Sequence, residues 1–450
     1  MRRARLLAHF ALLAAAAAAP VAAQGVTFGA SDDPLEAPVA SFARAGGYAA
    51  AYAAPAYLGA SWRAAVAVEG AYRSGPLSVG LGGTLHSGDG GLYDPEADEL
   101  YDLARLVRYV RLDPRPGLPV YARLGPPTGV TLGDGLLVRD YRATTAWDER
   151  TVGAEGAVES PGVVFGAFAG DLRANDVVGA HVEAAPAPRA SSRLLRSLRL
   201  GLGGIHDLGV DGAEAPTAFE VSARVEALRL LGLGLTPWAA YAEYLHYGRG
   251  GGGGVDFGSA EALGTARVRL RLGLLVSGDG FTPGYVGPFY QVSNVEARIV
   301  TAASFFEGDG TLAFAGVPLG EVEGGVDLLT AFEVAAFRTF ALAYHFRRHY
   351  GDQALSDFSL RLAFHPRFVD GLSVALAIER QGLRSWFSLF RDLEDQNALV
   401  FDVEYPLAGA AHLSIRSRYG YRRLADAEDG AERFLVQRRF EPFVGLRYRF

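Results

Sequence analysis

The feature that most constrains this fold is a strict alternation of apolar and polar residues, which recurs along the chain with turn-forming residues between segments. A β-strand sends successive side chains to opposite faces, so each such segment predicts a strand with one apolar and one polar face. The clearest segment sets apolar residues against arginines: Ala266, Val268, Leu270 and Leu272 against Arg267, Arg269 and Arg271. Similar segments begin at Leu77, Val178, Phe219, Phe358, Leu372, Leu399 and Leu413.

The last residues of the chain form another such strand. Val444, Leu446, Tyr448 and Phe450 lie on one side of it, and Arg447 and Arg449 lie on the other. A closing strand that ends in an aromatic residue resembles that of a Gram-negative outer-membrane β-barrel of the porin-like kind. For that class the resemblance implies antiparallel strands and insertion by the outer-membrane barrel assembly machinery. It also implies an assembly signal that includes Tyr448 and Phe450.

The amino terminus predicts export. Arg2, Arg3 and Arg5 precede an apolar region rich in alanine and leucine, and small residues follow at positions 21–23. This is the pattern of a cleaved signal peptide spanning residues 1–23. The apolar run is short for a membrane anchor. The chain has no cysteine, which excludes a lipoprotein anchor and disulfides. We therefore expect the protein in the cell outer membrane.

After cleavage, no stretch of about 18 uninterrupted apolar residues remains. A membrane protein without a spanning helix must satisfy its backbone in a closed barrel. The sequence thus predicts an all-β fold, a transmembrane antiparallel up-and-down β-barrel. At about 25 residues per strand with its share of loops, we expect about 16 strands, within a range of about 14 to 20. A soluble β-sandwich would also alternate, but it would need fewer strands, and the apolar faces here end in aromatic residues, as the interfacial girdles of a barrel do.

The chain divides into three expected parts: the signal peptide, residues 24–60 as a plug or periplasmic tail, and a barrel from 61 to 450. Short periplasmic turns are expected at residues 381–383 and 406–409, and a long extracellular loop at residues 422–432. The glycine run at residues 250–254 predicts a mobile outer loop. Residues 124–137 and 278–294 are rich in glycine and proline, and we expect both to fold into the lumen.

If the apolar faces contact lipid, the alternate residues line the lumen, which is then rich in charges of both signs. Such rows either set a transverse field that orients solutes or pair across the wall and rigidify it. The lumen-lining candidates are Glu220, Arg224, Glu226, Arg267, Arg269, Arg271, Asp402, Glu404, Arg416, Arg418, Arg447 and Arg449. The row Arg267, Arg269 and Arg271 is the best candidate for contact with anions, because guanidinium groups bind carboxylate and phosphate in a bidentate way.

Signatures of enzymes are weak. The chain has neither a Gly-x-Ser-x-Gly elbow nor a His-Glu-x-x-His motif, so we expect no catalytic residues, cofactor or metal site. His345, Arg347, Arg348 and His349 are expected in water or against lipid phosphate at a strand end. The tryptophans Trp62, Trp147, Trp238 and Trp386 are expected to anchor the barrel at the membrane interfaces.

The favoured function is a porin-like channel or transporter for small polar or anionic solutes. One alternative is a transporter of hydrophobic compounds in which residues 46–60 plug the barrel. The other is a structural or adhesive barrel that transports nothing, which a closed interior with paired charges would favour. The expected partners are outer-membrane lipid, the assembly machinery and small solutes. The net charge of −7 argues against a nucleic-acid partner.

Overall fold

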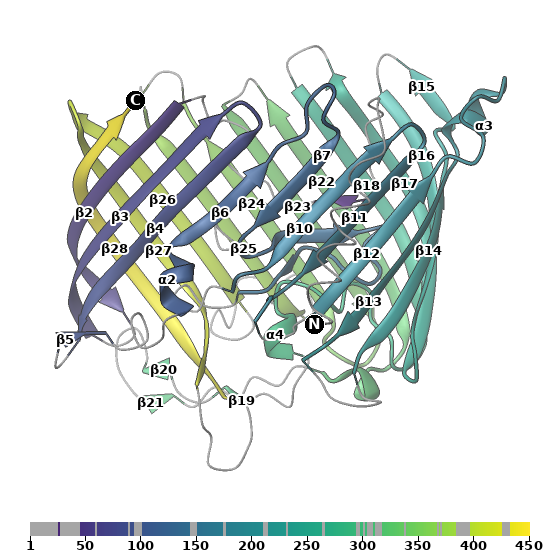
Figure 1. Ribbon diagram of the computed structural model, residues 1–450. Helices are drawn as coiled ribbons and strands as arrows, with labels where there is room; N and C mark the ends of the chain where they lie inside the picture. Colours follow the sequence, from purple (N-terminus) through teal and green to yellow (C-terminus); the bar gives the residue numbers. More distant parts are fainter. Residues whose placement is uncertain are drawn as a thin grey trace, which may run out of the picture.

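The computed structural model describes most of the chain and shows one large β-barrel (Figure 1). The described residues are 26–27, 46–58, 61–88, 91–93, 101–144, 151–173, 177–209, 215–230, 233–262, 266–293, 298–299, 302–303, 309–310, 317–336, 339–366, 369, 371–383, 397–424 and 433–450. The expected signal peptide lies outside these residues.

The barrel wall has 20 strands within the described ranges, each hydrogen-bonded antiparallel to its neighbours. This confirms the predicted fold, with a strand number at the upper end of the expected range. The first ten wall strands are β2 (Gly46–Leu58), β3 (Ser61–Ser74), β4 (Leu77–Gly88), β6 (Val107–Leu112), β7 (Val120–Leu124), β10 (Ala154–Ser160), β11 (Val163–Ala169), β12 (Val177–Ala184), β13 (Arg199–Asp207) and β14 (Thr217–Arg224). The others are β16 (Leu233–Tyr244), β17 (Gly248–Ala262), β18 (Ala266–Ser277), β22 (Gly325–Ala336), β23 (Phe340–Tyr350), β24 (Ser356–Phe364), β25 (Ser373–Leu383), β26 (Asn397–Ala408), β27 (Ala411–Leu424) and β28 (Arg433–Arg449).

The remaining described elements are short. They comprise β1 (Val26–Thr27), β5 (Gly91–Leu92), β8 (Thr128–Leu132), β9 (Tyr141–Arg142), β15 (Leu228–Leu230), β19 (Arg298–Ile299), β20 (Ala302–Ala303), β21 (Asp309–Gly310), α2 (Tyr101–Arg105), α3 (Arg193–Ser197), α4 (Tyr290–Ser293) and the 3₁₀ helix η4 (Leu319–Glu321). In the part of the chain that is described, no helix is long and apolar enough to cross a membrane.

The barrel closes where its first and last wall strands meet. Strand β2 pairs with β28 along most of its length, and the backbone N–H groups of Gly47 and Phe450 each donate to the carbonyl of the other at 2.9 Å. The prediction that residues 46–60 plug the barrel is therefore wrong, and the wall begins at Gly46 instead of Ser61. The Ala/Gly-rich composition and Pro55 concealed this strand. Upstream, β1 pairs with β8.

The two rims differ in the lengths of their connections. Turns of two residues, such as 75–76, 161–162 and 409–410, lie at the rim that holds Phe450, whereas the longest connections, such as 278–324 and 89–106, begin and end at the opposite rim. Since outer-membrane barrels have short periplasmic turns and long extracellular loops, the Phe450 rim faces the periplasm. The expected turn near residues 406–409 is confirmed. The expected turn at residues 381–383 is wrong, because these residues end β25 at the extracellular rim.

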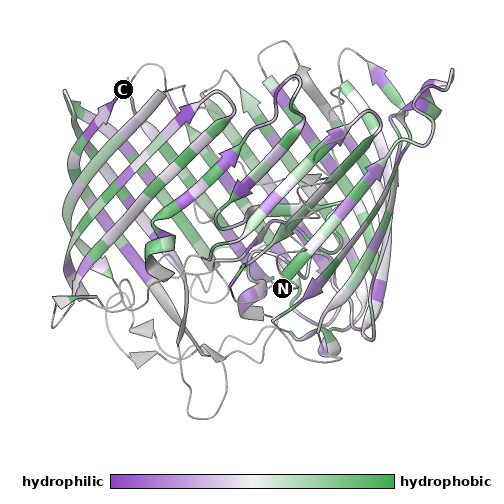
Figure 2. Cartoon of the chain, viewed as in Figure 1, coloured by the Kyte–Doolittle hydropathy of each residue, from purple (hydrophilic) through white to green (hydrophobic). Residues whose placement is uncertain are grey.

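Side chains alternate between the two surfaces of the wall, as the coloured residues along the strands of Figure 2 show. The outer surface exposes large apolar residues, among them Val68 at 60%, Leu202 at 53% and Leu446 at 64%. The inner surface buries Glu69, Glu220, Arg418 and Glu441 at 4% exposure or less. A closed barrel that is apolar outside and ionic inside satisfies its backbone in hydrocarbon. The protein is an outer-membrane β-barrel of the Gram-negative cell envelope.

The glycine run at residues 250–254 is part of strand β17, so the prediction of a mobile loop there is wrong. At Gly250 the reason is the close approach of residues 278–293, which fold into the lumen and pack against the inner face of β17. A Cβ atom on Gly250 would lie 2.5 Å from the ring of Phe281, a luminal residue. Glycine is therefore required for close packing at this position, and the sequence pattern of a loop arises from a tertiary contact.

Candidate functional site

The connection between β7 and β10 enters the barrel and forms what we call the luminal strap, residues 125–142. It contains β8 and β9, which pair with each other, and β8 also pairs with β1. Gly133 and Gly135 have φ angles of +58° and +79°, a conformation that favours glycine. Leu136, Leu137 and Val138 follow and are at most 2% exposed. The prediction that residues 124–137 fold into the lumen is confirmed.

The first set of contacts holds the strap to strands β14 and β18. The Glu220 carboxylate accepts the backbone N–H of Asp134 at 2.8 Å and that of Leu137 at 3.3 Å. The Arg271 guanidinium donates to the Asp134 carboxylate at 2.6 Å and to the Asp256 carboxylate at 2.7 Å. A Cβ on Gly133 would lie 2.3 Å from a Glu220 carboxylate oxygen, so this close approach needs glycine.

A second set of contacts holds the strap to strands β24 and β25. Arg139 lies 3.4 Å from the Asp357 carboxylate, and Asp140 lies 2.6 Å from the Arg361 guanidinium. Arg142 donates to the Glu379 carboxylate at 2.5 Å, and Arg361 donates to that same carboxylate at 2.7 Å. In the closed order of the wall, β24 lies half-way around from the pair β7 and β10. The strap therefore spans the lumen and divides it.

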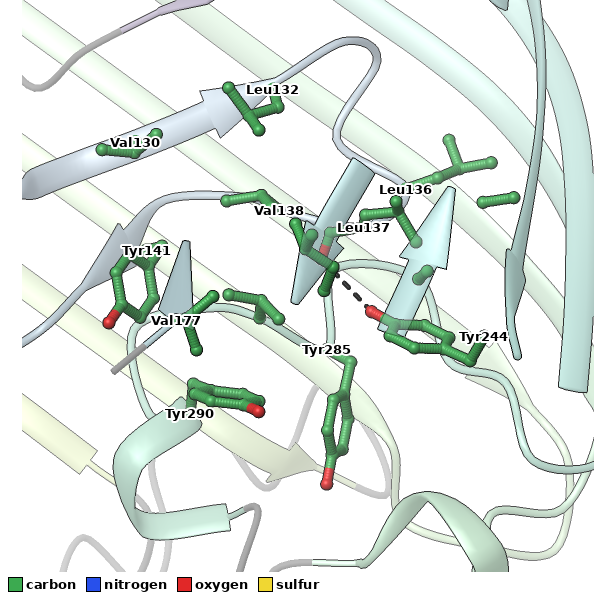
Figure 3. Packing of buried hydrophobic residues seen from close by; sticks show 14 of the residues in the cluster. Val130, Leu132, Leu136, Leu137, Val138, Tyr141, Val177, Tyr244, Tyr285 and Tyr290 are labelled. Atoms are coloured by element: carbon green, nitrogen blue, oxygen red, sulfur yellow. Dashed lines mark hydrogen bonds between the residues drawn. The ribbon is translucent and has the colours of Figure 1, made fainter. Parts of the chain in front are cut away.

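The expected inward fold of the second segment, residues 278–293, is confirmed. It follows β18 and runs beside the strap, with the N–H groups of Gly284 and Val286 donating to the carbonyls of Leu136 and Leu137 at 2.7 and 3.2 Å. Figure 3 shows the apolar cluster that results, which we call the luminal core. It includes Val130, Leu132, Leu136, Leu137, Val138, Tyr141, Val177, Tyr244, Tyr285 and Tyr290. Wall residues in this core include Ile205, Ala218 and Leu329. The same side of the wall also buries charged groups, such as Glu183, Asp256 and Asp327.

The other side of the lumen is bounded by β25–β28, β2–β4, β6 and β7, and we call it the ionic half. Its centre is Glu69, whose carboxylate has Arg416 at 2.8 Å, Arg447 at 3.1 Å and Arg108 at 3.6 Å. Arg447 also donates to the Glu404 carboxylate at 2.6 Å. Three guanidinium groups thus converge on the Glu69 carboxylate, and one of them also binds Glu404.

Aromatic rings support these arginines. The Arg447 guanidinium carbon lies 4.8 Å from the centre of the Tyr48 ring. That of Arg416 lies 5.6 Å from the rings of both Tyr52 and Phe443. Cation–π contacts of this kind hold a guanidinium group in a fixed orientation. The guanidinium groups are therefore fixed before any solute arrives.

Most of the predicted lumen-lining residues point inward. The majority of them form ion pairs or hydrogen bonds with other residues of the protein. Arg224 pairs with Glu183 and Arg418 pairs with Asp402, both in or near the wall interior. Of the arginine row on β18, Arg271 is committed to the strap, Arg269 lies 3.2 Å from Asp256, and Arg267 is exposed. Glu226 lies beyond the end of β14 and pairs with Arg193 and Arg229, and Arg449 is exposed near the periplasmic rim. Arg271 is therefore the member of this row that fastens the strap.

The expectation that His345, Arg347 and His349 lie in water or against lipid phosphate is wrong. Arg347 lies 2.5 Å from the Asp357 carboxylate and 3.0 Å from that of Asp327, inside the barrel. His349 lies 3.1 Å from Asp327. These groups alternate with the outward Phe346 and Arg348 positions, so they share the inner face of β23. Arg347 also donates to Thr282 at 3.1 Å and thereby reaches the second inward segment.

Trp238 is likewise not an interface anchor. It is 4% exposed and lies beneath the Arg271 guanidinium, 4.6 Å from its carbon. Trp62 is 61% exposed on the outer surface, as an anchor would be. Trp147 and Trp386 fall outside the described residues.

Several residues that build this site were not among the lumen-lining candidates. Glu69, Glu183, Asp327, Asp357, Arg361 and Glu379 each pair with an arginine or histidine in the lumen. His86, Arg439 and Glu441 form a further buried cluster, with His86 Nε2 at 3.0 Å from Glu441. Each lies on the inner face of an alternating strand, which was the available signal. The strap residues that pair with them had no such signal.

Two guanidinium groups favour the ionised form of Asp140 in the strap. Burial would raise the pKa of the Asp140 carboxyl, but the guanidinium groups of Arg361 and Arg142 outweigh burial and hold that pKa below its ordinary value. Among the described residues, no group of three or more histidine, aspartate or glutamate side chains is placed to hold a metal ion.

Solved structures that are similar to this chain share little of its sequence. OccK11 of Pseudomonas aeruginosa is 14% identical over 91% of this chain and 99% of its own, with a TM-score of 0.33. OccAB2 of Acinetobacter baumannii is 12% identical over 90% and 98%, with a TM-score of 0.30. Wzi of Escherichia coli, a carbohydrate-binding β-barrel involved in group 1 capsule assembly, is 10% identical over 90% and 85%, with a TM-score of 0.35. No family model and no curated protein matches the chain.

Proposed function

We propose that the protein is an outer-membrane channel for small polar solutes, with a preference for anions, and that the solute path follows the ionic half of the lumen. The observation that carries this proposal is the strap. It spans the barrel and packs with the second inward segment into the luminal core on one side, whereas the other side, the ionic half, carries the charged cluster around Glu69. A polar solute can exchange its water only for the charged surface.

The sign of the preference follows from the Glu69 cluster. Arg108, Arg416 and Arg447 surround Glu69, and Glu404 supplies the second carboxylate. A guanidinium group has five N–H donors, so one that shares a carboxylate with other arginines can still donate to a passing anion. Cations would be repelled by the same guanidinium groups.

Planar bilayer recordings of the refolded protein test this function. We expect discrete channels and, under a salt gradient, a reversal potential that indicates anion preference. Arg447→Gln should shift the reversal potential toward cations, because it leaves Glu69 and Glu404 with fewer positive partners. Asp352→Asn is the matched control, since Asp352 is exposed in an extracellular connection and should leave selectivity unchanged. Folded protein without conductance above background would overturn the proposal.

A second candidate, a structural barrel that transports nothing, is favoured by the pairing of luminal charges. Glu441 is fully buried and Asp402, Glu183 and Glu379 each have an arginine partner. In such a barrel the pairs only rigidify the wall. Solute-swelling of liposomes distinguishes the two candidates, because a structural barrel would admit no sugar or amino acid of any size.

A further inference from the structure

A strongly basic cluster lies outside the lumen, at the periplasmic rim. The connection from β12 to β13 carries α3, and the connection from β14 to β16 carries β15; Figure 1 shows both projecting together at the upper right. Arg193, Arg196, Arg199 and Arg229, which we call the rim arginine cluster, line an open cavity of about 400 Å³ with Ser197 and Glu226. Four guanidinium groups thus face one carboxylate.

The contacts within the cluster fix its shape but leave its charge unbalanced. Glu226 is shared by Arg193 and by Arg229, the latter at 2.7 Å. The Ser197 hydroxyl lies 3.2 Å from the Glu226 backbone nitrogen, which ties α3 to the β14–β16 connection. Arg199 donates to the carbonyls of Arg196 and Leu198 at 3.0 and 3.1 Å and so holds the end of α3. Arg193 and Arg229 remain 49% and 61% exposed.

Exposed leucines surround these charges. Leu194, Leu195, Leu228 and Leu233 are 50%, 51%, 53% and 49% exposed. Along β13 the outward Leu200 and Leu202 continue this apolar surface into the lipid-facing wall. A cavity with guanidinium groups beside a leucine surface matches one kind of molecule, an amphiphile with an anionic head and an apolar tail.

We propose that the rim arginine cluster binds the phosphate group of a phospholipid in the periplasmic leaflet of the outer membrane. The guanidinium groups accept the phosphate in the bidentate geometry that suits them, and the leucines contact the upper part of the acyl chains. The cluster stands on the outside of the barrel, so this lipid site is independent of solute passage.

The test uses the full-length mature protein, refolded in detergent, and native mass spectrometry with dimyristoyl phosphatidylglycerol as the probe. We expect one tightly held lipid. Dimyristoylglycerol, which has the same chains and no phosphate, should bind about tenfold more weakly or worse, as should the lipid to a variant with Arg193→Gln, Arg196→Gln and Arg229→Gln. The control Arg115→Gln removes an exposed arginine from another periplasmic turn and should leave lipid binding within about twofold.

Each other outcome decides against the proposal. Equal retention of lipid by the triple variant would show that the cluster does not bind it. Equal binding of dimyristoylglycerol would reduce the site to an apolar contact. Inorganic phosphate that displaces the lipid at low concentration would assign the cluster to a soluble anion. A change in oligomeric state with no loss of lipid would make this surface a contact between copies. The single variant Arg229→Gln, checked by heat-modified migration on gels, serves if the triple variant does not fold.

Discussion

At the scale of single residues, Glu220 connects the wall to the strap with one buried carboxylate. It is 2% exposed and accepts two backbone N–H groups of the strap. A buried donor that loses its acceptor costs about 1–3 kcal/mol. Glu220 is therefore more important to stability than its wall position alone would suggest.

We expect Glu220→Ala to lower the free energy of unfolding by about 1–3 kcal/mol and Glu220→Gln to lower it less, because an amide oxygen still accepts one N–H. Urea unfolding of the refolded protein, followed by tryptophan fluorescence, measures both. Glu333→Ala is the control, since Glu333 is 51% exposed on β22. Equal stability of Glu220→Ala and the unaltered protein would show that the strap is not fastened there.

Phe450 supports a second prediction at this scale, on assembly. Its ring is 64% exposed toward lipid, as is the side chain of Leu446 on the same strand. If the terminal aromatic belongs to the assembly signal, Phe450→Ala should reduce the amount of folded protein in the outer membrane severalfold while Leu446→Ala does not. The two variants should unfold at similar urea concentrations after refolding in vitro. Equal membrane levels of both variants would count against the signal.

At the scale of elements, the strap is the part most open to experiment. Its far end depends on the pairs Asp140 with Arg361 and Arg142 with Glu379, at 2.6 and 2.5 Å. The double variant Asp140→Asn and Arg142→Gln removes both pairs and leaves the contacts with Glu220 and Arg271 intact. We expect frequent transitions between conductance levels in single-channel recordings, because this end of the strap then keeps only the longer Arg139–Asp357 pair of its three ionic contacts. A steady single level would indicate that the remaining contacts hold the strap.

Many of the wall strands, but not all, could be predicted from the sequence. Alternation located the outward faces of β4, β14, β18 and β28, because lipid contact is a local requirement on each strand. It failed for β2, where alanine and glycine give little contrast between faces, and for the glycine run of β17, whose composition depends on Phe281.

The candidate site was predicted only in outline. The inner faces of the strands gave Glu220, Arg271, Glu404 and Arg447 as luminal groups, and the glycine-rich segments gave the inward folds. Their partners could not be predicted, because Asp134 and Arg271 are 137 positions apart in the chain. Alternation fixes the face on which a side chain lies and says nothing of which distant loop reaches it.

At the scale of the whole molecule, the two described tryptophans distinguish the outer surface from the interior. Trp62 is 61% exposed on the outside, and Trp238 is 4% exposed within the barrel. In vesicles of brominated phospholipid we expect quenching of tryptophan fluorescence, and we expect Trp62→Phe to reduce the quenched fraction while Trp238→Phe does not. The reverse result, or mature protein that is monodisperse without detergent, would contradict the orientation of the wall.

The luminal strap is anchored at opposite points of the barrel wall, and this also has a mechanical effect. A wide cylinder of hydrogen-bonded strands flattens readily under lateral pressure from the surrounding bilayer, since bending the sheet breaks no bonds. The strap, joined by the chain to β7 and β10 at one end and by ion pairs to β24 and β25 at the other, resists that flattening along one diameter only. The cross-section is therefore stiff along the strap and compliant across it. Changes in membrane tension would alter the width of the lumen across the strap more than its width along the strap.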